Sequence, residues 1–473
     1  MRKHGVDRHL KLRTQVTKAS WASEEAKWHV SIFDLETKQH AVVTADFFIS
    51  ATGRLNHAAF PDIEGLENFA GPVIHTANWD SSFDYSNRTL AVIGNGASGM
   101  QLIPNILADV GHIDHFVRSR TWVSPFFRQG LLTVSAENPG GHEYTAEKRH
   151  EFATDKAAYL EYRKSLDVKF HGPLRASISG SAENAALRRL LTDLMSDRVG
   201  NDERLLQKIL PDYAPGCKRL TPAPGYLESL KDPKVNYITE RIVRATASGL
   251  VTADGKEHPV EAIIAATGFS DSYIPRFPMI GLNGVNIQDQ WALDGPIGYP
   301  ETYFGVMAPD FPNLFFVLQV QGTAGGGTVP MQCEITATYI AKCIRKIQSQ
   351  SYSALAPRQD ATDDFNAVVE GFFDDKVSMD TCHSWWKVGQ GRTRNVVSWP
   401  GTGQHKVDIS RDPRWEDFVF QRRPGAERNR FEYFGNGVTK KEEEGDPEKL
   451  TRYLKEVGAV DLRTVHELWT EQD

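Results

Sequence analysis

Residues 69–99 read FAGPVIHTANWDSSFDYSNRTLAVIGNGASG, and this stretch decides the predicted fold. Its last six residues form a G-x-G-x-x-G pattern directly after the apolar run 90–93. In a dinucleotide-binding turn the first glycine makes the sharp turn, the second lets the backbone approach a pyrophosphate, and the third lets the helix pack on the strand. We therefore expect a nucleotide pyrophosphate to bind at this helix N-terminus, on Gly94, Asn95, Gly96, Ala97, Ser98 and Gly99.

The sequence on both sides of this turn has the pattern of a βαβ unit. Residues 89–94 predict a buried strand, residues 97–108 a helix with one apolar face, and residues 113–118 the next strand. Arg118 and Arg120 follow, where folds that bind NADH carry an acidic residue. Cations there favour a 2′-phosphate and predict NADPH, although a solvated strand end would also explain them.

Composition limits the class of protein. The chain has 473 residues and a mass of 52.9 kDa, and 40% of its residues are hydrophobic. This is enough for about three domains. The net charge of −7 comes without a basic stripe, which argues against nucleic acid and for a small-molecule partner.

The sequence carries no targeting or membrane signal. No apolar run reaches the roughly 18 residues of a membrane span, and the basic start lacks the apolar core of a secretory signal. Cys217, Cys333, Cys343 and Cys382 show neither C-x-x-C nor zinc-finger spacing. We interpret them as isolated thiols of a reducing compartment, expect no metal site, and predict a cytoplasmic location.

Two β-rich segments are near-copies, and each ends in Ala-Thr-Gly. Predicted strands lie at 10–12, 27–35 and 40–49 before residues 51–53, and at 234–238, 242–245, 250–252 and 260–265 before residues 266–268. This repeat predicts an α/β fold with two Rossmann-like nucleotide-binding domains. Because one glycine-rich turn accompanies two such segments, we expect the chain to begin part-way through its first nucleotide-binding domain.

Three further segments have predicted structure. Helical spacing in residues 144–212 predicts a helical insertion. The apolar run 314–318, a glycine-rich loop and a helix over residues 330–347 predict a second helix N-terminus suited to an anion, or a loop that caps a core helix. A last amphipathic helix is expected over residues 450–457.

The part of the opening stretch before the glycine turn is more specific than the turn itself. Phe69, Gly71, His75 and Trp79, followed by Asp80, match the pattern F-x-G-x-x-x-H-x-x-x-W-[PD]. Over roughly residues 1–435 the chain resembles Baeyer–Villiger monooxygenases, which are FAD- and NADPH-dependent flavoproteins, and is most similar to fungal members of polyketide secondary metabolism. Matching stretches also lie at 118–122, 216–219, 311–316 and 399–405.

The resemblance implies a reaction and a catalytic residue. NADPH would reduce FAD, and oxygen from O2 would be inserted beside the carbonyl of a ketone to give an ester or lactone. Arg219 would be the catalytic residue, since a permanently charged guanidinium stabilises a negatively charged oxygen without losing a proton. A phosphate or carboxylate clamp is the alternative role for Arg219.

The resemblance also implies cofactor contacts. Arg118 would meet the 2′-phosphate of NADPH, and His75 and Trp79 would couple domain movement to catalysis, although His75 could be a structural residue. The FAD contacts would be Thr52 and Gly53, the backbone of Val16 at the adenine end, and Gly325 and Met331 on the isoalloxazine side.

These inferences give a domain organisation. It comprises the remainder of an FAD-binding domain with a linker (1–84), an NADP-binding domain in two parts (85–140 and 213–268), the helical insertion (141–212), the second part of the FAD-binding domain (269–410) and a C-terminal extension (411–473). The missing FAD-binding turn would lie within roughly 120 to 130 residues before Met1, and its loss would impair activity. The alternatives are a non-catalytic or partner-dependent NADP-binding protein and an N- or S-hydroxylating flavin monooxygenase.

Overall fold

The computed structural model describes residues 2–125, 144–168, 171, 174–270, 273–326, 328–388, 393–425, 429–451, 454–456 and 459–460. The chain forms two compact units, Met1–Cys343 with Leu355–Val419, and Ile344–Ala354 with Phe420–Asp473. The smaller unit holds the C-terminal elements α11 (Lys440–Glu444), α12 (Pro447–Leu450), β21 (Leu454–Glu456) and β22 (Ala459–Val460). The helix expected over residues 450–457 is therefore wrong, because β21 pairs with β22 in an antiparallel hairpin.

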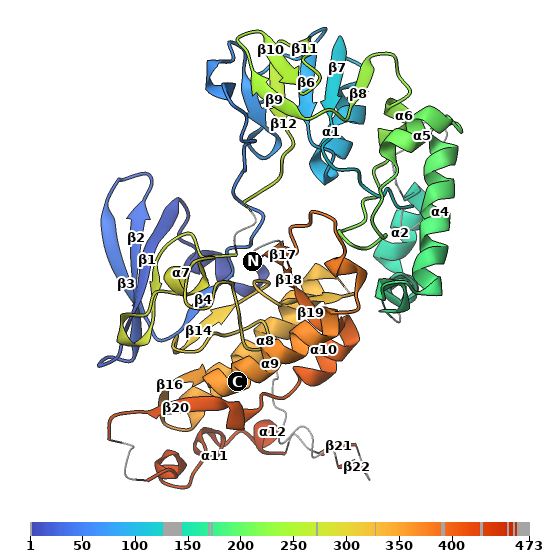
Figure 1. The fold of residues 1–473 in the computed structure, drawn as a ribbon. Coiled ribbons are helices and arrows are strands. Elements are labelled where there is room, and N and C mark those ends of the chain that lie inside the picture. Colours follow the sequence, from blue (N-terminus) through green and yellow to red (C-terminus); the bar gives the residue numbers. More distant parts are fainter. Residues whose placement is uncertain are drawn as a thin grey trace. The chain divides into compact units, whose positions relative to one another are not determined.

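A five-stranded parallel sheet is the centre of the region around the glycine turn (Figure 1). Its order is β5 (Val73–His75), β12 (Ala262–Ala265), β6 (Thr89–Ile93), β7 (His112–Phe116) and β8 (Val235–Ile238). The continuous apolar run of β12 is buried at every position, as is typical of a parallel strand covered on both faces. Between β6 and β7 lies α1 (Ala97–Ile106), whose Met100 and Ile103 are fully buried in the same core as Leu90. The predicted βαβ unit is confirmed.

Two small antiparallel sheets correspond to the predicted near-copies. The first contains β1 (Thr14–Ala22), β2 (Lys27–Asp34) and β3 (His40–Ala45), with β13 (Met279–Ile280) parallel to β1; the second contains β9 (Ile242–Ala245), β10 (Gly249–Thr252) and β11 (Glu257–Pro259).

Two strand predictions in these segments are wrong. The first strand begins at Thr14 rather than at residue 10, because the residues that pack inward, Ala19 and Trp21, come later. Residues 234–238 belong to the parallel sheet, because buried Val235 and Tyr237 pair with β7.

Both Ala-Thr-Gly sequences follow a parallel strand. β12 runs into residues 266–268, and β4 (Phe48–Ser50), which pairs in parallel with β14 (Leu314–Phe316), runs into residues 51–53. After β14 come β15 (Thr323–Gly325), parallel to β19 (Ser398–Thr402), and α8 (Val329–Ser349). The predicted order of strand, glycine loop and helix is confirmed, and the carboxyl ends of β4 and β14 meet at one edge, where α/β folds bind ligands.

The remaining elements are mostly helical. The insertion consists of α2 (Ala146–Thr154), α3 (Lys156–Asp167), α4 (Ala182–Arg198) and α5 (Glu203–Ile209). The other elements are α6 (Tyr226–Ser229), α7 (Ile287–Trp291), β16 (Tyr352–Pro357), α9 (Gln359–Phe373), β17 (Lys387–Val388), β18 (Arg394–Asn395), α10 (Gly403–Ile409) and β20 (Phe418–Arg422). Across the described residues, every helix is too short or too polar to span a bilayer.

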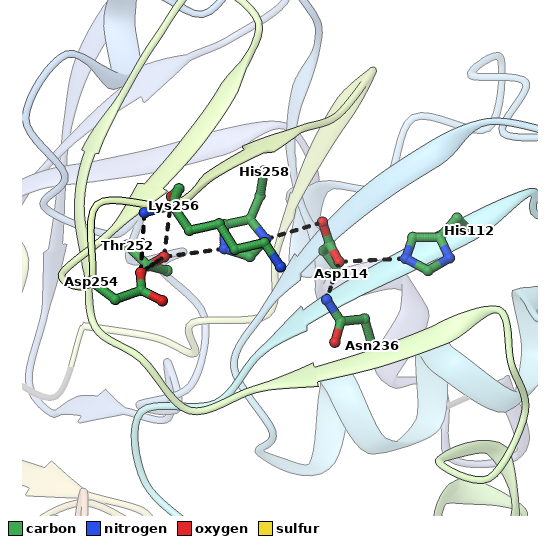
Figure 2. A network of polar contacts seen from close by, with 7 residues as sticks. All are labelled: His112, Asp114, Asn236, Thr252, Asp254, Lys256 and His258. Atoms are coloured by element: carbon green, nitrogen blue, oxygen red, sulfur yellow. Dashed lines mark hydrogen bonds and ion pairs between the residues drawn. The ribbon is translucent and has the colours of Figure 1, made fainter.

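A buried carboxylate joins the parallel sheet to the second antiparallel sheet (Figure 2). Asp114 of β7 accepts a hydrogen bond of 2.8 Å from Asn236 of β8, and His112 lies 3.4 Å from the same oxygen. The other carboxylate oxygen lies 3.5 Å from Nδ1 of His258 in β11, whose Nε2 is 3.1 Å from the hydroxyl of Thr252. Because a buried charge is costly without partners, this network fixes the place of β10 and β11 on the parallel sheet.

One prediction about the cysteines is wrong. Cys217 and Cys382 form a disulfide with a Cα–Cα distance of 6.1 Å, whereas Cys333 and Cys343 are free. The two cysteines are 165 residues apart, so the local spacing of cysteines in the sequence does not indicate that they pair. Beside the bond, the backbone N–H of Ala214 donates to a carboxylate oxygen of Asp380 at 2.9 Å. In the described part of the chain, no group of three or more His, Cys, Asp and Glu side chains could hold a metal ion.

Candidate cofactor and active site

The glycine turn after β6 has two crowded positions and one open position. A Cβ atom at Gly94, where φ is +103°, would lie 2.6 Å from the Ala266 carbonyl oxygen, and one at Gly99 would lie 2.2 Å from the Gly94 carbonyl oxygen. A Cβ at Gly96 would meet nothing within 4 Å. Gly96 is also the N-cap of α1 and provides no side-chain cap, so the first N–H groups of the helix stay available. This arrangement fits a pyrophosphate that approaches Gly96.

The contrast between these glycines gives a first prediction. Gly99→Ala is expected to lower the free energy of unfolding by about 1–3 kcal/mol, because the added methyl group collides with backbone. Gly96→Ala is expected to keep the stability within about 0.5 kcal/mol but to weaken NADPH binding, because the methyl group enters the open space. Urea unfolding and NADPH titration of both variants measure the two effects. Equal losses of stability in the two variants would contradict this assignment of roles.

Buried His115 is linked to the glycine turn through the hydroxyl of Tyr226. The Nδ1 of His115 lies 3.3 Å from the Val92 carbonyl oxygen, which can only accept, so Nδ1 carries the proton and Nε2 accepts from the hydroxyl of Tyr226 at 2.9 Å. Buried Asn95 of the turn interacts with the same hydroxyl. Burial lowers the pKa of His115 to about 4 and raises that of Tyr226 well above its usual value. His115 is therefore neutral at physiological pH.

The depressed pKa of His115 predicts acid sensitivity. Between pH 6.5 and about 4 the unfolded chain binds a proton at this residue that the folded chain does not, so stability falls as the pH is lowered. The expected contribution is about 3 kcal/mol across this window. Urea unfolding at pH 7 and pH 4.5 should show a smaller pH dependence for His115→Gln than for the wild type. His150→Gln, at an exposed position, is the control and should keep the wild-type dependence.

Two cations lie together at the end of β7. Lys218 is partly buried; its ammonium group donates to the hydroxyl of Ser119 at 3.4 Å and lies 5.2 Å from the centre of the Tyr213 ring. Burial lowers the pKa of Lys218 to about 8, and the positive charge of exposed Arg118 acts in the same direction. Among the described residues, neither cation has a carboxylate at ion-pair distance. The pair therefore fits a phosphate.

The structure separates Arg120 from this pair. Its guanidinium donates to the Leu210 carbonyl oxygen at 3.2 Å, directly after α5. Lys218 in turn is absent from the residues that the sequence predicts. The sequence feature that could have identified Lys218 is its position next to Arg219 in the Gly-Cys-Lys-Arg stretch.

The four fixed residues before the glycine turn lie along β5 and the segment that follows it. Phe69 is buried, and a Cβ at Gly71 would lie 2.3 Å from the Glu261 carbonyl oxygen. His75 accepts at Nδ1 from the Ala77 backbone N–H at 3.0 Å, and partly buried Trp79 packs near the core around α1.

The second ring nitrogen of His75, Nε2, differs from Nδ1 in its contacts. Nε2 is buried and has no partner among the described residues, and the ring packs edge-on near Phe60 and Phe269. Burial lowers the pKa of His75, and the nearby backbone of Gly268 opposes this change. The Nδ1 contact gives His75 a structural task, while its role in coupling domain movement stays a prediction.

The second cluster lies at the carboxyl ends of β4 and β14. Gly53 has φ +71° and open space where a Cβ would stand. Buried Gln319 donates to the Gly53 carbonyl oxygen at 3.3 Å and to the Thr52 hydroxyl at 3.4 Å. Arg54 donates to the Leu318 carbonyl oxygen at 2.9 Å. Thr52 and Gly53 thus lie at the carboxyl end of β4, and their contact with FAD stays a prediction.

Other predicted flavin contacts lie on neighbouring elements. Gly325 ends β15 and Met331 lies in the first turn of α8, next to Gln332, whose buried side-chain oxygen has no hydrogen-bond partner within the described ranges. An unpartnered acceptor is a feature that a flavin nucleotide could use, so Gln332 fits the cofactor, whereas a Cβ at Gly325 would lie 3.3 Å from Leu174. Val16 lies at a β-bulge of β1, in a different sheet from β4.

The positive charge of Arg219 is felt in the second cluster. Arg219 follows Lys218 directly and is exposed, and its positive charge contributes to the lowered pKa of Arg54, for which burial is the larger cause. The charge of the guanidinium next to Lys218 thus reaches the residue after Ala51-Thr52-Gly53.

Comparison with known proteins gives a consistent set of relatives. The chain is 32% identical over 456 residues to the FAD-binding monooxygenase tazF of Aspergillus terreus, covering 94% of this chain and 78% of that protein. It is 31% identical to the FAD-binding monooxygenase stcW of Emericella nidulans, covering 91% and 70%. It is 28% identical to a Baeyer–Villiger monooxygenase of Pseudomonas aeruginosa, covering 84% and 71%.

Solved structures show the same fold. A closed crystal structure of cyclohexanone monooxygenase superposes with a TM-score of 0.72 at 22% identity, covering 89% of this chain and 83% of that one. A complex of OTEMO with FAD and NADP superposes with a TM-score of 0.71 at 22% identity, covering 88% and 83%. No protein-family model matches the sequence. On the identity and coverage of its relatives, the chain belongs to the FAD-binding monooxygenases, the family that includes the Baeyer–Villiger monooxygenases.

Proposed function

We propose that this protein is a Baeyer–Villiger-type monooxygenase, which uses NADPH, FAD and O2 to insert oxygen beside the carbonyl of a small ketone and forms an ester or lactone. The observation that carries the proposal is the placement of Arg219. It directly follows Lys218, one of the two cations suited to NADPH, and its charge reaches Arg54, the residue after the turn suited to FAD. The name of the Pseudomonas aeruginosa relative and the FAD and NADP in the OTEMO complex agree with this reading.

The residues around the glycine turn would hold NADPH. The N–H groups at the start of α1 would bind the pyrophosphate over open Gly96. Arg118 and Lys218 would bind the 2′-phosphate, for which two cations without a carboxylate are suited. Asn95, held through Tyr226 and His115, keeps the turn in place.

The second cluster would hold FAD. Thr52, Gly53 and Gln319 would line the nucleotide at the end of β4, and Gly325 and Met331 would lie on the ring side. When bound, FAD supplies the two-electron chemistry by which O2 becomes an oxygen donor. The chain's own contribution is to place the ketone and to stabilise charge.

Arg219 would stabilise the negative charge that develops during attack on the ketone. A guanidinium is suited to this task because it stays charged and offers several donors. Neighbouring Lys218, with a pKa of about 8, could lose its proton in the same environment. The permanently charged Arg219 is therefore the better candidate for charge stabilisation.

The test is product analysis with the purified chain, FAD, NADPH and isotopically labelled O2. One labelled oxygen atom in an ester or lactone, formed in step with NADPH oxidation, is the expected result. NADPH oxidation that yields only hydrogen peroxide across a broad ketone panel would contradict the proposal. Oxygenated amines or sulfides without any ester would assign the chain to the hydroxylating monooxygenases, and NADPH binding without oxidation would make it a non-catalytic binder.

A further inference from the structure

Arg54, the residue after Ala51-Thr52-Gly53, is a cation whose hydrogen-bond partners are neutral groups. Its guanidinium is partly buried and donates to the Leu318 carbonyl oxygen at 2.9 Å and to the Thr323 hydroxyl at 3.0 Å. It also lies 5.1 Å over the centre of the Trp385 ring. The two hydrogen bonds use two of the five N–H donors of the guanidinium, and the Trp385 ring stabilises part of its charge.

The charged and titratable neighbours of Arg54 act in both directions. In the described residues no carboxylate lies at ion-pair distance from it. Burial is the main cause that lowers the pKa of Arg54; Tyr273 acts in the opposite direction, and the positive charge of Arg219 adds a smaller lowering. A partly buried guanidinium without a carboxylate partner can bind an external anion through its unused N–H donors.

Arg54 also faces an open space. A cavity of about 50 Å³ is lined by Arg54 and Tyr273, by exposed Arg276, and by Thr52 and Gln319, which also belong to the cluster proposed for FAD. One water occupies about 30 Å³ of liquid, so the cavity accommodates a group of a few heavy atoms, such as a carboxylate. All of its described lining residues are neutral or cationic.

We propose that Arg54 is a specificity-determining residue that binds an acidic group of the substrate, so that the enzyme prefers ketones carrying a carboxylate or an acidic phenol over their neutral analogues. This inference rests on the proposed monooxygenase function and deepens it. Arg54 holds the acid group through the donors that its contacts leave unused, while Arg219 faces the reacting carbonyl. A guanidinium suits this role because it binds a carboxylate through two parallel hydrogen bonds.

The same charge could instead serve an anionic group of a cofactor, and the experiment separates the two sources. Three ketones are used, each as the free carboxylate and as its methyl ester: 4-acetylbenzoate, 4-oxopentanoate and 4-oxocyclohexanecarboxylate. For Arg54→Gln we expect kcat/KM for the carboxylates to fall about 10- to 100-fold, the loss of a charge-assisted contact, and kcat/KM for the methyl esters to stay within about twofold. Arg54→Lys should keep part of the preference, because an ammonium retains the charge but not the fork of donors.

A second measurement does not depend on turnover. Because Arg54 lies over Trp385, binding of 4-acetylbenzoate should change the tryptophan fluorescence of the wild type saturably, and its methyl ester should not. The carboxylate response should be lost in Arg54→Gln and in Trp385→Phe. Exposed Arg241 lies near the start of β9, and Arg241→Gln is the matched control that should keep both preference and response.

The outcomes are distinct. If no ketone is oxygenated, the proposed function fails, and the fluorescence titration alone then decides on the anion site. If the esters are oxygenated but the wild type shows no preference for carboxylates, the inference about Arg54 is overturned. Equal losses for acids and esters in Arg54→Gln, or a lower flavin content of that variant, would also overturn it and assign the charge to the cofactor.

Discussion

Replacing Arg219 by Ala is expected to abolish ester formation while NADPH is still oxidised. Removing one donor that stabilises a developing negative charge costs about 3–4 kcal/mol, which corresponds to a 100- to 1000-fold lower rate of oxygenation. We propose that other residues, chiefly the glycine turn, Arg118 and Lys218, bind NADPH, so the electrons should appear as hydrogen peroxide instead. Parallel assays of NADPH oxidation, peroxide and ester measure this shift.

The controls for Arg219 follow from its exposure. Because the side chain is exposed, its removal should leave the free energy of unfolding unchanged within about 0.5 kcal/mol. Arg219→Lys should restore only part of the oxygenation, since an ammonium has a different geometry of donors. Arg189→Ala, at an exposed position in α4, should behave as wild type. Unchanged ester formation in Arg219→Ala would contradict a catalytic role for Arg219 and would leave it as a phosphate or carboxylate clamp or without a role in the reaction.

A double replacement of Arg118 and Lys218 by Ala is expected to remove the preference for NADPH over NADH. Each side chain offers a charge-assisted contact to a phosphate that NADH lacks, worth about 1.5–3 kcal/mol. The expected rise in KM for NADPH is therefore about 10- to 100-fold for each single variant, and KM for NADH should stay nearly constant. Steady-state kinetics with both coenzymes measure the change.

Arg120 provides the matched comparison for that pair. It lies two residues from Arg118, but its guanidinium is bound to the Leu210 carbonyl oxygen. Arg120→Ala should therefore leave the NADPH to NADH ratio near its wild-type value. A loss of affinity for NADH equal to that for NADPH, in the double variant, would show that the two cations hold the turn rather than the 2′-phosphate.

The sequence predicts best those features whose determinants are local. The unit from β6 through α1 to β7 rests on contiguous apolar runs and on glycines within six positions, and it lies where the pattern places it. The first strand of the chain was less predictable, because the inward packing of Ala19 and Trp21 depends on distant partners such as β13.

The candidate site shows the same division. Arg118 follows from its place after a strand, whereas the role of Lys218 depends on residues 119 and 213, which come to it only in the folded chain. Arg54 is similar, since its partners Leu318, Thr323 and Trp385 are more than 260 residues away. Such positions need the fold before their charge can be interpreted.

The Cys217–Cys382 bond makes the reductant in the buffer an experimental variable for this protein. Cys217 lies two residues before Arg219, and its partner is 165 residues further along the chain. In the chain-entropy model, a cross-link that closes a loop of this length stabilises the folded protein by about 5 kcal/mol. With the bond formed, residue 217 is covalently anchored to the segment that precedes Trp385. With the bond reduced, the Ala214–Asp380 hydrogen bond and side-chain packing are left to hold the backbone next to Arg219. Thiol reagents added by routine during purification would therefore change the anchoring of the arginine on which oxygenation is proposed to depend.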